Sequence, residues 1–362
     1  MQALPNLFDL PIAEPAAKLA YEAIQQGKNV FGVVHRQVLS NLKSTFYPRL
    51  GKVDSLDDET LEYVRNRQTD LLERDWQDAQ EGVYPVSLLF DQPWDEFFRL
   101  YPQVWLDAPQ IWQRVDQKKV QEFAPEIDVE GYPRYYIQNF HHQTDGYLSE
   151  TSAEIYDLQV ELLFGGTADA MRRRILAPLK RGLAAFSSIP ANQIRILDVP
   201  CGAGRTLKQL RGTFPDASLY GVDLSPTYLQ KANRLISQDR GVLPQLLQAN
   251  AESLPYVDNY FHGISSVFLF HELPAPARQN VIDECFRVLR PGGTFVICDS
   301  IQLDDSPELK MAINNFPVMM HEPYYRHYST DNLVKRLQDA GFVDVETDVH
   351  FMSKYLFAHK PV

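Results

Sequence analysis

Two glycines, Gly202 and Gly204, close the segment Leu197–Gly204, which reads LDVPCGAG. Glycines at this spacing let the backbone approach a ligand closely, and a helix that starts behind them offers free N–H groups. A carboxylate, Asp223, follows about 20 residues later, at the end of the next β-rich run. It can accept hydrogen bonds from both hydroxyls of a ribose. The pattern therefore predicts a site for an adenosine-containing ligand.

The residues around the glycines indicate which nucleotide this is. A dinucleotide fingerprint would place a third glycine at position 207, where the chain has Leu207. The carboxylate of Asp198 would repel a pyrophosphate but suits a cationic ligand. S-adenosylmethionine carries a sulfonium and an ammonium group and no phosphate. The charge pattern favours S-adenosylmethionine over NAD, and an NAD-dependent oxidoreductase is the less favoured alternative.

The elements that must position these residues alternate from residue 194 onwards. Short β-rich runs alternate with helical stretches, which predicts a parallel sheet with helices on both faces. The expected strands are 194–199, 218–223, 243–250, 261–268 and 294–299. Three helices are expected between them: one from the glycine turn to about residue 211, one at 226–237 and one at 275–289. A helix at 330–340 then precedes strands 343–349 and 352–359, which are close enough to form a hairpin. We expect an α/β fold: a Rossmann-like, seven-stranded, mostly parallel sheet that ends in an antiparallel hairpin.

The first half of the chain has a different composition. All four tryptophans precede residue 115. Residues 55–80 have the spacing of a helix with a solvated acidic face, whereas repeated prolines argue against long helices between residues 84 and 133. Residues 152–186 are again helix-forming, with breaks at Gly165-Gly166 and Pro178. We expect a mainly helical cap over the mouth of the nucleotide site, with an isolated partner-binding domain as the alternative.

The overall charge restricts the partners. The chain of 362 residues has 47 acidic and 35 basic side chains, a net charge of −12. This balance argues against binding to nucleic acid. We interpret the basic run Arg172–Arg174, with Lys180 and Arg181 nearby, as the solvated face of a helix. The apolar runs are far shorter than the ~20 residues of a membrane-spanning helix, so we expect no integral membrane segment, while peripheral contact with a membrane is left open.

Cellular location is predicted from the cysteines and the first residues. The three cysteines cannot pair completely and none has CxxC spacing. Met1–Pro5 has no basic region followed by an apolar stretch, so no signal peptide is expected. These features favour the reducing cytoplasm. The sequence does not indicate an oligomeric state.

Four motifs occur in a characteristic order: LDVPCGAG at 197–204, GVDLS at 221–225, QANAESLP at 248–255 and RVLRPGG at 287–293. Together they resemble the class I S-adenosylmethionine-dependent methyltransferases, most closely the branch that acts in ubiquinone and menaquinone biosynthesis and its small-molecule relatives. The resemblance implies residues 190–362 as the methyltransferase domain, 151–189 as linking helices and 1–150 as the cap or substrate region. It also implies a small acceptor, apolar or ring-bearing and similar to a quinone or isoprenoid, with S-adenosylhomocysteine as the second product.

The resemblance also assigns cofactor contacts. Asp198, Gly202 and Gly204 would surround the methionyl part, Asp223 would hold the ribose hydroxyls and Leu224 would pack on adenine. The other implied contacts are Pro200, Cys201, Asn250, Ala251, Glu252 and, near the methyl group, Phe268. The chain departs from the family at Pro200, where a small residue is usual, and at Asn250 and His262, where aspartates are common.

Methyl transfer from a sulfonium needs a base only if the acceptor is a hydroxyl or a carbon acid. His271 follows the fourth predicted strand, at the edge where ligands bind in open α/β sheets, and is either a base or a packing residue. His141 and His142 are the other candidate bases. Candidate substrate contacts are Tyr147, Tyr324, Tyr325 and His327. A scaffold that binds S-adenosylmethionine without catalysis is the remaining alternative.

No metal site is predicted. His271-Glu272 and His321-Glu322 both begin like the zinc motif HExxH, but the fifth residues are Ala275 and Tyr325. Neither segment can therefore place two imidazoles on one helical turn.

Overall fold

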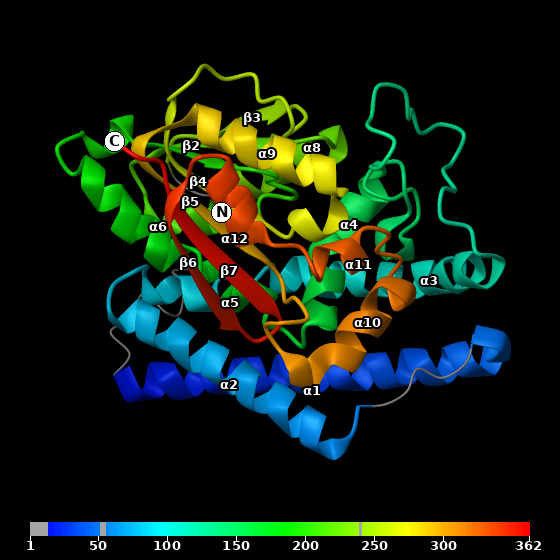
Figure 1. Ribbon diagram of the computed structural model, residues 1–362. Helices are drawn as coiled ribbons and strands as arrows, with labels where there is room; N and C mark the ends of the chain where they lie inside the picture. Colours follow the sequence, from blue (N-terminus) through cyan, green and yellow to red (C-terminus); the bar gives the residue numbers. More distant parts are fainter. Residues whose placement is uncertain (1–13, 51–55, 239–240) are drawn as a thin grey trace.

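A computed structural model describes residues 14–50, 56–238 and 241–362. Its centre is a seven-stranded sheet of order β3-β2-β1-β4-β5-β7-β6 (Figure 1). The strands are β1 (Arg195–Asp198), β2 (Ser218–Asp223), β3 (Gln245–Gln248), β4 (Phe261–Val267), β5 (Leu289–Ser300), β6 (Val343–His350) and β7 (Ser353–His359). The first five are parallel, and β7 is antiparallel to both β5 and β6. The expected fold class is confirmed.

Helices cover both faces of this sheet. Those of the carboxyl-terminal half are α7 (Arg205–Thr213), α8 (Pro226–Ile236), α9 (Ala275–Val288), α10 (Lys310–Met319), α11 (Tyr325–Tyr328) and α12 (Leu333–Asp339). Alternate residues of β5 enter two separate cores, because successive side chains of a strand point to opposite faces. Phe295 and Ile297 pack with α9 and α12, whereas Val296 and Cys298 pack with α7 and with α6 (Leu176–Leu183). The strand order reverses between β1 and β4, and ligands of open α/β sheets bind at such a reversal.

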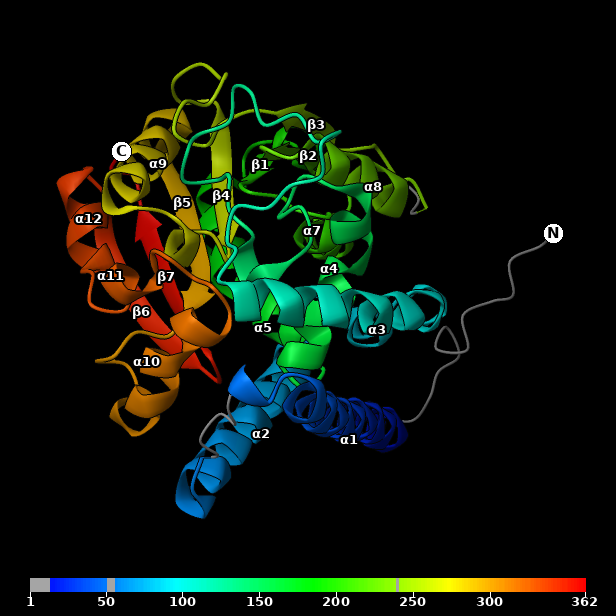
Figure 2. The same ribbon diagram turned by 90° about the vertical axis from the view of Figure 1, so that its right-hand side faces the viewer.

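The first half of the chain forms the remaining helices: α1 (Glu14–Phe46), α2 (Asp58–Gln80), α3 (Trp94–Gln117), α4 (Glu150–Leu163), α5 (Ala168–Arg173) and α6 (Leu176–Leu183). In Figure 2, α1 and α2 form an outer layer, and α3, α4 and α5 lie between it and the sheet. The chain between α3 and α4 runs as a long loop beside the ends of the strands (Figure 2). Among the described residues, no helix combines the length and apolar character needed to cross a bilayer. The segment Met1–Pro5, on which the signal-peptide prediction rests, lies outside the described residues.

Helix α3 contradicts the expectation of short pieces between residues 84 and 133. It runs for 24 residues and contains Pro102 and Pro109. An internal proline costs a helix about 3 kcal/mol. The cost is offset because Phe97, Leu100 and Val104 bury one face of α3 against α4. Pro178 likewise lies inside α6 rather than ending a helix.

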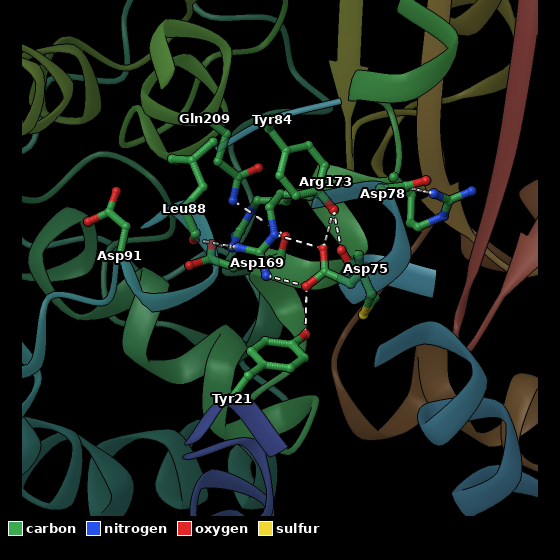
Figure 3. A network of polar contacts seen from close by, with 12 residues as sticks. Tyr21, Asp75, Asp78, Tyr84, Leu88, Asp91, Asp169, Arg173 and Gln209 are labelled. Carbon is green, nitrogen blue, oxygen red and sulfur yellow. Dashed lines mark hydrogen bonds and ion pairs between the residues drawn. The ribbon is translucent and has the colours of Figure 1, made fainter. Parts of the chain in front are cut away.

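Arg172–Arg174 are buried, so their interpretation as a solvated face is wrong, whereas Lys180 and Arg181 in α6 are exposed as expected. Arg173 is 1% exposed and forms a two-pronged ion pair with Asp75, with N···O distances of 2.8 and 2.6 Å (Figure 3). Tyr21 and Tyr84 donate hydroxyl hydrogen bonds of 2.6 and 2.7 Å to the same carboxylate. Asp75 of α2 and Arg173 of α5 therefore neutralise each other in the space between α1, α2 and α5. Burying either charge there without the other would cost free energy.

Candidate active site

The glycine turn after β1 has the conformation that its residues require. Gly202 and Gly204 have positive φ angles of 50° and 91°, which glycine adopts without strain. A Cβ at Gly204 would lie 2.9 Å from the Cα of Ala232 in α8, so this glycine allows close packing. A Cβ at Gly202 would meet no described atom within 4 Å. The backbone at Gly202 is therefore open to a ligand.

Asp223 connects this turn to β2. Its Oδ2 accepts a 2.9 Å hydrogen bond from the N–H of Gly202, and its Oδ1 accepts one of 2.8 Å from Ser225. Burial raises the pKa of Asp223 to about 6, although these backbone hydrogen bonds oppose the shift. The carboxylate stands at the end of the second strand, where the ribose-binding carboxylate of such folds is found.

A cavity of about 1030 Å³, part of it open to solvent, extends from this turn. Nine of the predicted site residues line it: Tyr147, Pro200, Cys201, Gly202, Asp223, Leu224, Asn250, Ala251 and Phe268. Gly204 lies behind the turn. Glu252 stands beside the cavity and accepts a 2.6 Å hydrogen bond from the Tyr135 hydroxyl. The structure thus brings the predicted cofactor residues to one place.

Asp198 is fully buried at the end of β1. Its Oδ1 accepts a 2.7 Å hydrogen bond from Ser265, whereas its Oδ2 has no hydrogen-bond partner within the described part of the chain. Burial raises the pKa of Asp198 to about 8. A buried carboxylate oxygen without a donor costs free energy, and the ammonium group of S-adenosylmethionine is a donor of the right charge. Asp198 itself does not line the cavity, so the open backbone at Gly202 is the feature of this turn that fits the predicted cofactor.

Aromatic side chains form the opposite wall of the cavity. Tyr147 stacks on Phe140 with ring centroids 5.5 Å apart and meets Tyr156 and Tyr228 edge-on at 5.9 and 5.6 Å. These rings come from the loop after α3, from α4 and from α8. The Tyr147 carbonyl accepts a 2.6 Å hydrogen bond from Ser225, which fixes the loop to the start of α8. The loop is therefore an integral wall of the site.

Arg172 is a cavity residue that the sequence interpretation missed. It is 4% exposed, lines the cavity and lies 3.1 Å from Asp169 and 3.7 Å from Asp157. Burial lowers its pKa, but the two carboxylates outweigh that effect and raise it. The sequence could not identify Arg172 as a cavity residue, because three consecutive arginines do not indicate which of them points toward the cavity.

A second polar group adjoins the aromatic wall. His141, His271, Glu272 and Glu322 each offer one nitrogen or oxygen atom, and these atoms lie within 4.8 Å of one another. We call these four residues the His/Glu cluster. His141 comes from the loop after α3, His271 and Glu272 follow β4, and Glu322 lies between α10 and α11. Only Glu272 of the four lines the cavity itself.

The His/Glu cluster is electrostatically coupled. Burial lowers the pKa of His271, but Asp299 at 2.7 Å outweighs it and raises the pKa to about 9. Burial and the neighbouring Glu322 raise the pKa of Glu272 to about 7. For His141, burial is again outweighed by Glu322, whose Oε1 lies 2.7 Å from Nε2. Groups that can hold or release a proton near neutral pH therefore stand beside the cavity.

Several predicted residues lie elsewhere. His142 packs against His321 with ring centroids 5.5 Å apart, and burial lowers its pKa to about 4. The Tyr325 hydroxyl is 2.8 Å from the Ser300 hydroxyl, and the largely exposed His327 contacts Arg278 at 2.8 Å. Tyr324 meets Tyr135 edge-on at 6.5 Å, one layer from the cavity. The structure brings none of these four to the cavity wall.

Comparison with known proteins supports the interpretation of the carboxyl-terminal half. Residues 196–293 match a family model described as a methyltransferase domain. An uncharacterized protein of Mycobacterium tuberculosis is 35% identical over 34% of this chain and 43% of its own length. A demethylmenaquinone methyltransferase of Geobacillus is 27% identical over 42% of this chain and 72% of its own length. A sarcosine/dimethylglycine N-methyltransferase of Halorhodospira halochloris is 29% identical over 51% and 62%, respectively.

The chain spans less than half the length, 43%, of the first curated relatives that it matches. The family match lies on the strands and turns that carry the predicted cofactor residues. Over residues 196–293 the chain is therefore similar in sequence to methyltransferase domains.

Proposed function

We propose that the protein transfers the methyl group of S-adenosylmethionine to a small acceptor that carries a ring and a hydroxyl. The observation that supports this most is one continuous cavity. It extends from the Gly202 turn and Asp223 to a wall of tyrosines and the carboxylate of Glu272. One end suits the cofactor and the other suits a flat apolar molecule with a polar group.

The cofactor end is assigned by donor and acceptor chemistry. Asp223 accepts from the ribose hydroxyls, Asn250 reaches the adenine amino group through its amide oxygen, and Asp198, buried at the end of β1, attracts the methionyl ammonium. The cofactor supplies a methyl group that its sulfonium already activates. The protein must align the acceptor with the S–CH3 bond, with the reacting atoms about 3–3.5 Å apart, and exclude water.

The acceptor end favours a ring. Aromatic side chains bind flat apolar groups over a large area, and they prefer offset or edge-on contacts such as those already present among Tyr147, Tyr156 and Tyr228. At the end of this wall, the Tyr147 hydroxyl donates a 2.6 Å hydrogen bond to Glu272. A hydroxyl on the acceptor would form a further hydrogen bond with this polar group, whereas a plain hydrocarbon would form none. A hydroquinone or phenol fits this division.

Methylation of a hydroxyl releases one proton. The O–CH3 bond forms with an electron pair of oxygen, and the S–CH3 bond breaks with its pair going to sulfur. The hydroxyl proton must leave the acceptor, and the His/Glu cluster is the nearest set of groups to receive it. This requirement separates a hydroxyl acceptor from a neutral amine, which can react through its free electron pair.

Calorimetric titration tests the cofactor assignment. S-adenosylmethionine and S-adenosylhomocysteine should bind the purified protein, whereas NAD should not. Asp223→Ala should weaken both adenosyl ligands by about 1–3 kcal/mol, and Asp216→Ala, an exposed aspartate shortly before β2, should have no effect. Binding of NAD alone would overturn the proposal in favour of an oxidoreductase.

A labelled methyl donor tests the acceptor class. The protein should transfer label to hydroquinones or phenols, and not to sarcosine or dimethylglycine at equal concentration. Transfer only to the amines contradicts the acceptor proposal and leaves the methyltransferase assignment intact. Cofactor binding without transfer to any of these compounds indicates a scaffold.

A further inference from the structure

The His/Glu cluster has the dimensions of a metal site. Two atoms bound at about 2.0–2.2 Å to one ion lie at most about 4.4 Å apart. The four ligand atoms of the cluster lie within 4.8 Å of one another, so small side-chain movements would place all four around one ion. The three segments that supply them are far apart in sequence, and each is held by its own packing.

Glu322 provides an independent observation. It is 1% exposed, and its Oε2 has no hydrogen bond within the described residues. Its one close polar neighbour is His141 Nε2, at 2.7 Å from Oε1. A buried carboxylate normally accepts several hydrogen bonds, and one without them is strongly destabilising. One carboxylate oxygen of Glu322 belongs to the same group of atoms as His271 and Glu272.

The residues behind the cluster have the arrangement typical of metal ligands. A metal-bound histidine almost always donates its other ring N–H to a carboxylate or carbonyl. His271 Nδ1 lies 2.7 Å from Asp299 Oδ1, and the other oxygen of Asp299 accepts backbone hydrogen bonds from Leu269 and Phe270. Asp299 therefore holds the ring so that Nε2 faces the cluster. Glu272 is held in the same way by the Tyr147 hydroxyl.

A bound dication would balance the carboxylates of the cluster once its histidines are neutral. Glu272, Glu322 and Asp299 carry three carboxylates within a buried volume, with two imidazoles between them. When the imidazoles are neutral, as metal ligands must be, a divalent ion compensates most of this charge.

We propose that His141, His271, Glu272 and Glu322 bind one first-row transition-metal dication, such as Mn²⁺, Fe²⁺, Co²⁺ or Zn²⁺, which coordinates the hydroxyl oxygen of the acceptor. Two imidazoles with two carboxylates favour these ions over Mg²⁺ and Ca²⁺, which prefer oxygen ligands alone. The sequence interpretation predicted no metal, because neither HExxH-like segment supplies two histidines.

The position of the ion explains its use. Glu272 lines the cavity and the other three ligands do not, so the ion would lie beside the cavity, within reach of a hydroxyl on the acceptor. A coordinated hydroxyl loses its proton more readily. The oxygen then attacks the methyl carbon, and the S–CH3 bond breaks toward sulfur. The proton passes to water rather than to the His/Glu cluster, because the side chains of the cluster are then occupied as ligands. This role rests on the proposed function, whereas binding of the ion does not.

The test is metal binding by the full chain after removal of any affinity tag. The protein is freed of metal with a chelator, which is then removed, and is titrated with Mn²⁺, Co²⁺ and Zn²⁺ and with Mg²⁺ for comparison. Calorimetry should show one transition-metal ion per chain and weaker binding of Mg²⁺. Bound Co²⁺ should give the visible absorption of a nitrogen and oxygen ligand field.

Substitutions locate the ion. Glu322→Gln and His271→Gln should each weaken binding at least about 100-fold, the upper end of the loss seen for an outer-shell partner. The matched control is His321→Gln, because His321 pairs with Gln138 and is not part of the cluster. Its affinity should stay within about twofold of the parent.

Each outcome decides the proposal. Absence of a bound transition metal, or unchanged affinity in both cluster variants, overturns it and leaves a proton-sharing cluster. If a variant does not fold, as judged by circular dichroism, the stoichiometry of the parent protein and the His321→Gln control decide. Parallel titration with S-adenosylmethionine separates the two proposals: cofactor binding without metal binding refutes only the metal site, and the converse refutes only the methyltransferase proposal.

Discussion

The two ends of the cavity are built in different ways. The cofactor end consists of backbone groups and single carboxylates at the ends of adjacent parallel strands, as at Gly202 and Asp223. The acceptor end consists of side chains from the loop after α3, from α4, from the turn after β4 and from the segment before α11. The first depends on one sheet edge, whereas the second depends on how distant segments pack. Substitutions that disturb the packing between these segments should therefore weaken binding of the acceptor before they weaken binding of the cofactor.

The largest expected effect concerns the buried charges that position α5 and its Arg172. Asp75→Ala would leave the Arg173 guanidinium and the Tyr21 and Tyr84 hydroxyls without their acceptor (Figure 3). We expect the free energy of unfolding to fall by about 3–5 kcal/mol, measured by urea denaturation. Asp70→Ala, an exposed aspartate in the same helix, is the control. A loss no larger than that of the control would show that α5 is held by other contacts.

The next effect should separate the cofactor end from the rest. Gly204→Ala would place a Cβ 2.9 Å from the Cα of Ala232 at a φ of 91°. We expect a cost of about 1–3 kcal/mol and a loss of S-adenosylmethionine affinity of at least about tenfold. Gly82→Ala also has a positive φ but meets no described atom within 4 Å, so it provides the strain without the clash. Calorimetry of both variants compares them, and equal affinities would refute the role of the turn.

A smaller effect is expected from pH. Since the pKa of Asp223 is raised to about 6, this carboxylate is ionised at pH 7.5 and becomes protonated as the pH falls below 6. The ionised form accepts the ribose hydroxyls, so S-adenosylmethionine affinity should fall below pH 6 by up to about tenfold per unit. Asp223→Asn should bind more weakly and lose this dependence. Affinity that is constant between pH 5 and pH 8 would contradict the assignment.

The smallest effect should be confined to the acceptor end. Tyr147→Phe removes the hydrogen bond to Glu272 and keeps the ring. We expect a loss of about 0.5–1.5 kcal/mol, seen as a higher KM for the acceptor with unchanged affinity for S-adenosylmethionine. Tyr324→Phe, one layer further out, is the comparison. A change in cofactor affinity for Tyr147→Phe would show that the two ends are not independent.

The sheet and the cofactor end could be predicted from the sequence because their signals are local. The β1 turn and Asp223 follow strands directly, and the strand order of the fold brings consecutive motifs to one edge. Helix α3 could not be predicted, because the burial of its apolar face outweighs its two prolines. The buried arginine run could not be predicted either, since its partners Asp75 and Asp78 lie about a hundred residues away, in α2.

The acceptor end shows the same limit in its chemistry. The sequence predicts no zinc motif at His271 and Glu272, because no second histidine follows them at helical spacing. The structure supplies His141 and Glu322 from other segments. The spacing of residues within one segment can therefore reveal metal ligands only when a single helix carries them.

Tyr147 belongs to both ends of the cavity at once. Its backbone carbonyl accepts from Ser225, which also caps α8, and its hydroxyl donates to Glu272. If the loop after α3 moves away from the site, its hydrogen bond with Ser225 at the start of α8 and its hydrogen bond with Glu272 therefore break in the same movement. Exchange of spent cofactor and departure of the methylated product would then share one opening event, so the two products should leave the enzyme with the same rate-limiting motion.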